Sequence, residues 1–117
     1  MLITPDHYLL RLLRSQGRSF DALGVPAHDD RHGAVDDRAI WRLFCKDYSL
    51  FSGTPSHLWL MHSLHQFFGI DAPLSEATAD ATYDRIAEAL ATPQMRPLAI
   101  LDRANVEAIA TTEYATD

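Results

Sequence analysis

The side chains best suited to chemistry gather where the first expected helix begins. Asp6, His7 and Tyr8 are consecutive, and two arginines, Arg11 and Arg14, follow three and six residues after Tyr8. An imidazole and a phenol can transfer or polarise protons on sugar hydroxyls, and a guanidinium is complementary to a carboxylate. This set of side chains is therefore suited to binding a hydroxy acid. The alternative is an ordinary amphipathic helix start, with Tyr8 half-buried and both arginines solvated.

The other histidines do not predict a metal site. His62 and His65 lie three residues apart and could share a helix face, but no acidic residue stands at the spacing of an H-E-x-x-H zinc site. A second group in a polar stretch consists of His28, Asp29, Asp30 and His32. A hydrated charge cluster is more usual there than a preorganised set of ligands. We therefore expect no metal ligands in this chain.

Length and charge limit the classes of protein to which this chain can belong. The chain has 117 residues, 47% of them apolar and 22% charged, which predicts one folded domain. Its formal net charge of -6 repels nucleic acid and anionic lipid. No window approaches the length of about 18 apolar residues that spans a membrane, and the start MLITPDHYLL does not resemble a secretion signal. We expect a cytoplasmic protein that binds neither nucleic acid nor membrane.

The only cysteine, Cys45, lies at the end of the apolar run that begins at Ile40. It cannot form a disulfide within the chain. We therefore predict a buried, reduced thiol rather than a reactive one.

Cap residues and prolines recur along the chain and predict five helices. A Thr or Ser before the helix, often proline at its first position, and glycine or proline after its end are typical boundary signals. The predicted helices run from Asp6 to Gln16, from Asp36 to between Phe51 and Gly53, from Pro55 to Gly69, from Thr78 to Thr92 and from Pro97 to Ala104. A short turn is expected from Ser19 to Leu23, and a mobile surface loop from Val25 to Val35.

The third helix is the expected core element, because apolar residues are spread along its length. They are Leu58, Trp59, Met61, Leu64, Phe67 and Phe68. Trp59 is expected to anchor the core, since so large an aromatic side chain contributes heavily when it is buried. On the fourth helix the expected apolar face consists of Ala79, Tyr83, Ile86, Ala87 and Leu90.

The end of the chain changes character after Asn105. Residues Val106 to Thr112 are mostly β-branched or small, a composition that favours a strand. A lone strand cannot pair its own backbone groups, so it either lacks a partner sheet or extends the last helix. The predicted fold is therefore all-α, an orthogonal bundle of five helices in one domain over residues 1–117, with at most one unpaired strand, Val106 to Thr112.

Several segments, taken in order, resemble the uronate isomerase family, also called glucuronate isomerase, of the amidohydrolase superfamily. The first is DHY-x-x-R-x-x-R-x-x-G, formed by Asp6, His7, Tyr8, Arg11, Arg14 and Gly17. The later ones are G-T-P-x-x-x-W with Gly53, Pro55 and Trp59, then Leu64 and Phe68-Gly69-Ile70, then Thr78-Ala79-Asp80, and finally Asn105-Val106 and Thr111-Thr112. The resemblance extends from about Thr4 to Thr112, and its order and spacing are more specific than any single segment.

The resemblance implies a metal-dependent isomerase that interconverts aldose and ketose uronates, such as glucuronate, galacturonate and fructuronate. It implies a barrel with a helical insertion after its first strand, and this chain resembles that insertion. His7 and Tyr8 match family positions that contribute to the active site, so they are the candidate catalytic residues. Arg11 and Arg14 match in position and are candidate substrate-binding residues.

The family's metal ligands lie outside the matching segment. The resemblance therefore implies a divalent metal, zinc or similar, in the parent enzyme, no cofactor in this chain, and no activity of the chain by itself. The expected partners are a uronate sugar, the missing barrel domain, and further copies of the enzyme in a homo-oligomer. Val106 to Thr112 would be the second barrel strand. The alternative function is a stand-alone helical module that binds a protein partner through its aromatic surface.

Overall fold

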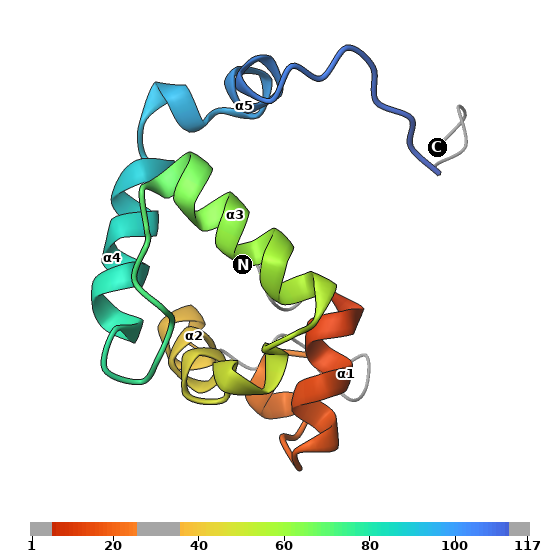
Figure 1. Ribbon diagram of the computed structural model, residues 1–117, viewed down its shortest axis with the longest axis vertical. Coiled ribbons are helices and arrows are strands. Elements are labelled where there is room, and N and C mark those ends of the chain that lie inside the picture. Colours follow the sequence, from red (N-terminus) through yellow and green to blue (C-terminus); the bar gives the residue numbers. More distant parts are fainter. Residues whose placement is uncertain (1–5, 26–35, 113–117) are drawn as a thin grey trace. The chain divides into compact units, whose positions relative to one another are not determined.

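A computed structural model describes residues 6–25 and 36–112 of the chain. Within these residues the elements are α1 (His7–Ser15), α2 (Asp37–Lys46), α3 (Pro55–Phe68), α4 (Ala79–Leu90) and α5 (Pro97–Arg103). Three short 3-10 turns join them, η1 (Asp21–Leu23), η2 (Tyr48–Phe51) and η3 (Pro93–Met95) (Figure 1). The predicted loop from residue 26 onward and the His28 to His32 cluster lie outside the described residues.

The all-α fold class is confirmed. The strand predicted for Val106 to Thr112 is wrong, because this part of the described chain has no regular secondary structure. Only its first residue makes a recorded backbone hydrogen bond, from Val106 N–H to the Leu101 carbonyl at 3.0 Å. Strand propensity needs a neighbouring strand to accept the ladder hydrogen bonds, and the described residues provide none.

The helix caps confirm the signals at Thr54-Pro55 and Gly69 and show a further cap, Asp6, that was not predicted. The Asp6 carboxylate accepts hydrogen bonds from the backbone N–H groups of Tyr8 and Leu9, at 2.9 and 3.1 Å, and so begins α1. Thr54 Oγ1 accepts from the His57 N–H at 3.2 Å, directly before Pro55 at the first position of α3. Gly69 ends α3 with a φ of 63°, a backbone conformation that glycine adopts at low cost.

The chain divides into two compact units. The first comprises residues 1–86 and holds α1, α2, α3 and most of α4. The second comprises residues 87–117 and holds the last turn of α4, η3 and α5. Within the second unit, an Arg103 Nη1 to Met95 sulfur contact of 3.7 Å links α5 to η3, and α5 itself buries no residue. The further expectation, that residues 1–117 are one inserted domain, stays a prediction.

The core of the first unit is built by α2 and the turn that follows it. Phe44 is fully buried, and its ring centroid lies 5.6 Å from that of Trp41, 5.5 Å from Tyr48 and 5.4 Å from Phe51. The Trp41 Nε1–H donates to the Ala79 carbonyl at 3.0 Å and to Thr82 Oγ1 at 3.1 Å. The indole is therefore both buried and hydrogen-bonded, which ties α2 to the start of α4.

Trp59 does not anchor the core, and that prediction is wrong. Its side chain is 63% exposed, that of Leu58 is 67% exposed, and α3 buries only Leu64 and Phe68. The error has a physical reason. Helix α3 carries apolar residues on more than one face, so the sequence pattern does not show which face packs inward. On α4 the buried residues are Ala79, Thr82 and Ile86, and of the expected face Tyr83 is only half-buried and Leu90 is exposed.

Ion pairs reinforce the contact between α2 and α4 on its solvent side. Arg38 pairs with Asp80 and Asp84, Arg42 pairs with Asp80, and the Arg38 guanidinium lies 4.3 Å from the centre of the Tyr83 ring. Hydrogen bonds from Arg42 and Arg38 lower the pKa of Asp80. The network keeps that carboxylate charged while it joins two helices that are far apart in sequence.

Candidate functional site

The two candidate catalytic residues, His7 and Tyr8, occupy the first turn of α1. Both side chains are exposed, with 60% of Tyr8 accessible to solvent. Their ring centroids lie 4.2 Å apart with the planes inclined by 33°, so the imidazole and the phenol are in contact. The Asp6 cap fixes the backbone beneath them. The structure brings the pair together on the surface rather than in the core.

The two candidate substrate-binding residues differ in their surroundings. Arg11 is exposed on the second turn of α1. Arg14 is also exposed, but its Nη1 donates to the Arg18 carbonyl at 2.9 Å and its guanidinium carbon lies 4.4 Å from the centre of the Phe20 ring. On a helix, residues three and four apart are neighbours, so Arg11 lies beside both His7 and Tyr8, whereas Arg14 is one turn further away. The roles of all four residues stay predictions.

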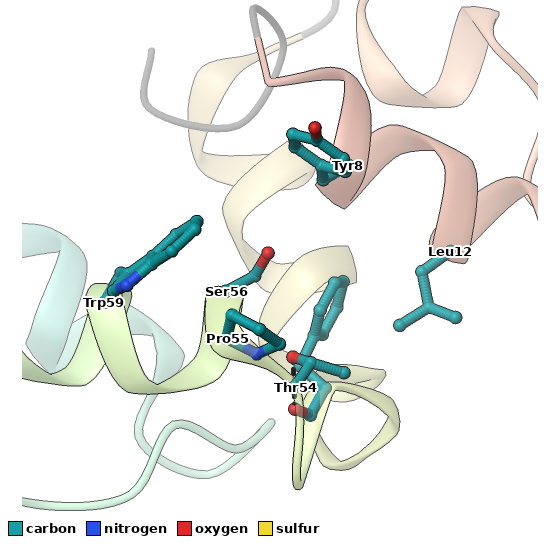
Figure 2. A pocket seen from close by; sticks show the side chains of 7 residues that line it. Tyr8, Leu12, Thr54, Pro55, Ser56 and Trp59 are labelled. Carbon is teal, nitrogen blue, oxygen red and sulfur yellow. Dashed lines mark hydrogen bonds between the residues drawn. The ribbon is translucent and has the colours of Figure 1, made fainter.

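An open groove lies between α1 and the start of α3, with Tyr8 on one side and Trp59 on the other (Figure 2). Its volume is about 390 Å³. The groove is lined by Tyr8, Leu12, Phe51, Thr54, Pro55, Ser56 and Trp59. None of these side chains is charged, and their polar atoms are hydroxyl groups and the indole N–H. Figure 2 shows Ser56 and Pro55 between the two aromatic rings.

A second depression adjoins the first and has a volume of about 230 Å³. Ser56 and Trp59 line both hollows, so Trp59 forms a wall that they share. The remaining lining residues of the second hollow are Asp6, Leu9, Leu60, Ser63, Leu64 and Phe68. Both hollows are lined by residues of α1 and α3.

The polar groups of the groove differ in whether this chain already uses them. Thr54 Oγ1 donates to the Phe51 carbonyl at 2.7 Å and accepts from the His57 N–H, so the helix cap occupies it. The Tyr8 hydroxyl, Ser56 Oγ and Trp59 Nε1 form no recorded hydrogen bond with another residue of the described segments. These three groups can therefore bind a ligand without breaking an interaction shown here.

Other chemical groups are less well placed. No group of three or more His, Cys, Asp or Glu side chains that could hold a metal ion occurs among residues 6–25 and 36–112. His65 Nδ1 pairs with Asp71, and His62 is exposed. Cys45 is buried as predicted, and this burial raises the pKa of its thiol to about 12, which leaves little thiolate to act as a nucleophile. No described helix is long and apolar enough to cross a membrane.

The groove residues on α3 were not predicted from the sequence. Trp59 was expected in the core, and Ser56 was given no role. One signal was available, because the G-T-P-x-x-x-W segment ties Trp59 to the helix start by a fixed spacing. What the pattern lacked was any indication that this face of α3 meets Tyr8 across a hollow.

Comparison with known proteins first gives the class. Curated proteins named uronate isomerase from Brucella canis and Rhizobium meliloti are 48% and 50% identical to this chain over 117 residues. The crystal structure of glucuronate isomerase from Caulobacter crescentus superimposes with a TM-score of 0.89 at 49% identity, covering 96% of this chain. The family model for glucuronate isomerase matches residues 1–117. The chain therefore belongs to the glucuronate isomerase family.

The match covers all of this chain but only part of each relative. The chain spans 25% of the length of the two curated proteins and 23% of the Caulobacter crescentus chain. The family is shown for these 117 residues, and the fold for the part of them that the structure describes.

Proposed function

We propose that this chain is the helical part of a uronate isomerase and contributes His7 and Tyr8 to the active site. In this proposal the helices are inserted after the first strand of an amidohydrolase-type barrel, and the complete cytoplasmic enzyme interconverts aldose and ketose uronates such as glucuronate or galacturonate. Family membership supports the reaction class. The observation that carries the assignment of residues is the exposed His7–Tyr8 pair at the edge of a groove.

The chemistry asked of this pair is proton transfer and polarisation. Aldose–ketose isomerisation moves hydrogen between two neighbouring carbons while their oxygens exchange between hydroxyl and carbonyl. The Tyr8 hydroxyl is suited to donating a hydrogen bond to the oxygen that changes, and the His7 imidazole to accepting or returning a proton. The two rings are in contact, so both groups can reach the same sugar.

The carboxylate of the uronate requires a cation. Arg11 is exposed beside His7 and Tyr8, and the described residues show no ion pair that engages it. Arg14 already donates to a backbone carbonyl and contacts Phe20. We propose that both arginines bind the carboxylate, with Arg11 closer to the reacting end of the sugar and Arg14 at the outer end of the site.

The family resemblance implies a divalent metal in the complete enzyme. A catalytic zinc typically needs three protein ligands and an open position. Among the described residues no three His, Cys, Asp or Glu side chains are grouped in this way. The proposal instead places the ligands in the remaining polypeptide.

An isomerase assay on two proteins tests the proposal. The full-length protein should convert glucuronate or galacturonate to its ketose. The 117-residue chain alone should form no ketose and should not bind zinc stoichiometrically below micromolar concentration, since the proposed metal ligands lie in the rest of the enzyme. Ketose formation by the isolated chain, or none by the metal-loaded full-length protein, would contradict the assignment.

A second candidate function is a helical module that binds a protein partner. The exposed Leu58 and Trp59 on one turn of α3 favour it. Sequencing the gene on both sides of this segment separates the two functions. A continuing reading frame with an H-x-H motif upstream supports the isomerase, and a frame limited to these residues supports the module.

A further inference from the structure

Trp59 has an unusual position for the largest type of side chain. It lies on a helix that packs Leu64 and Phe68 into the core, yet its own side chain is 63% exposed. Such exposure costs free energy in water, because an indole contributes a large apolar area when it is covered. Trp59 also lines both hollows between α1 and α3.

The chemistry around the indole limits what can cover it. The groove carries no charged side chain, and its polar groups without a recorded partner are the Tyr8 hydroxyl, Ser56 Oγ and Trp59 Nε1. A small-molecule site typically combines an apolar or aromatic wall with a few directed polar groups. A single sugar has this same combination, with C–H groups along one face and hydroxyls at the edges. The side chains of a docked apolar protein segment would leave the three polar groups unused.

We infer that Trp59 contacts the substrate of the proposed isomerase, its indole covering the C–H face of the uronate while Tyr8 acts on the reacting oxygen. Ser56 lies between the two rings and hydrogen-bonds a sugar hydroxyl (Figure 2). The uncharged groove takes the hydroxylated part of the sugar, and the carboxylate lies outside it toward Arg11. This inference rests on the proposed function, because it names the wall of the same site.

The test uses the full-length enzyme and the adjacent residue as a matched control. Leu58 is as exposed as Trp59 and lies next to it on α3, but it lines neither hollow. We expect Trp59→Ala to raise KM about tenfold, the size of an aromatic contact, with a smaller change in kcat. Trp59→Phe should recover most of this loss, because it restores an aromatic face. Leu58→Ala should leave both constants within about twofold of wild type.

The outcomes separate this inference from the proposed function. If the wild-type enzyme isomerises uronates but Trp59→Ala leaves KM unchanged, the inference is wrong and the proposed function stands. If Trp59→Ala and Trp59→Phe instead dissociate or unfold the enzyme, Trp59 packs against other protein and the inference is also wrong. If the wild-type enzyme has no uronate isomerase activity, the proposed function fails and the inference fails with it.

Discussion

The two tryptophans of this chain divide the first unit into regions with opposite properties. Trp41 is 3% exposed, and its Nε1–H donates to the Ala79 carbonyl and to Thr82 Oγ1. Trp59 is 63% exposed, and no described residue accepts a recorded hydrogen bond from its indole. Around Trp41 lie buried rings and ion pairs between helices; around Trp59 lie an open groove and the exposed His7–Tyr8 pair.

This difference shows where the chain stabilises itself and where it leaves side chains exposed. At the α2–α4 contact the apolar surface of Trp41 is buried and its N–H is hydrogen-bonded, as is typical of a residue that stabilises the fold. At the α1–α3 groove most of the Trp59 side chain is exposed to solvent, and its N–H has no recorded partner. We interpret the α2–α4 contact as the structural part of this unit and the α1–α3 groove as its functional part.

Replacing each tryptophan by alanine should give the largest contrast in stability. Trp41→Ala removes a buried indole and leaves a cavity, at an expected cost of about 3 to 5 kcal/mol in the free energy of unfolding. Trp59→Ala removes an exposed indole and should cost less than about 1 kcal/mol. Urea unfolding of the 117-residue chain measures both. Equal losses would remove the distinction between the two regions.

Alkaline pH should weaken the structural region. Burial raises the pKa of the Cys45 thiol to about 12. The pKa of Tyr48 is also raised, mainly by burial and to a lesser extent by the nearby charge of Cys45. Above the ordinary thiol pKa of about 8.5, the unfolded chain releases a proton that the folded chain still holds, so stability falls as pH rises toward 12. Relative to its own value at pH 7, the unfolding midpoint of Cys45→Ala should fall less than that of wild type. An identical alkaline fall in both proteins would contradict this prediction.

The ion pairs between α2 and α4 should have the smallest effect. Because Arg42 and Arg38 lower the pKa of Asp80, this carboxylate stabilises the fold above its unfolded pKa and stops doing so as pH falls through its lowered folded value. The groups are exposed, so salt should weaken the effect. Thermal melts of wild type and Asp80→Asn, between pH 2 and 6 at low and high salt, check this. A pH-dependent difference that persists undiminished in high salt would contradict it.

Helix existence and most helix ends could be predicted because they depend on local signals. Thr54 and Gly69 act on their own backbone within a few residues, and each is the cap that the sequence predicts. The second helix was predicted too long, because α2 ends at Lys46 and not between Phe51 and Gly53. The strand at Val106 to Thr112 could not be judged in the same way. Its formation depends on a partner strand that these residues do not supply.

Burial was harder to predict than secondary structure. The sequence patterns of Trp41 and Trp59 look alike, since each lies among apolar residues on a long helix. The buried Trp41 meets Ala79 and Thr82, which are far away in the sequence and accept a hydrogen bond from its indole N–H, whereas neither accepts one from Trp59. The candidate site residues His7 and Tyr8 were predicted from a family motif, whereas the groove that Tyr8 lines is visible only once α3 is packed near α1.

The most direct test of the functional region is Tyr8→Phe, measured as turnover in the full-length enzyme and as thermal stability in the same protein. If the Tyr8 hydroxyl acts on the reacting sugar, its loss should lower turnover by about 100 to 10,000-fold. Because the hydroxyl is exposed and has no recorded partner in the described residues, the stability should change by less than about 1 kcal/mol. Full activity with lowered stability would show that Tyr8 is structural and would contradict the assignment of the α1–α3 groove to catalysis.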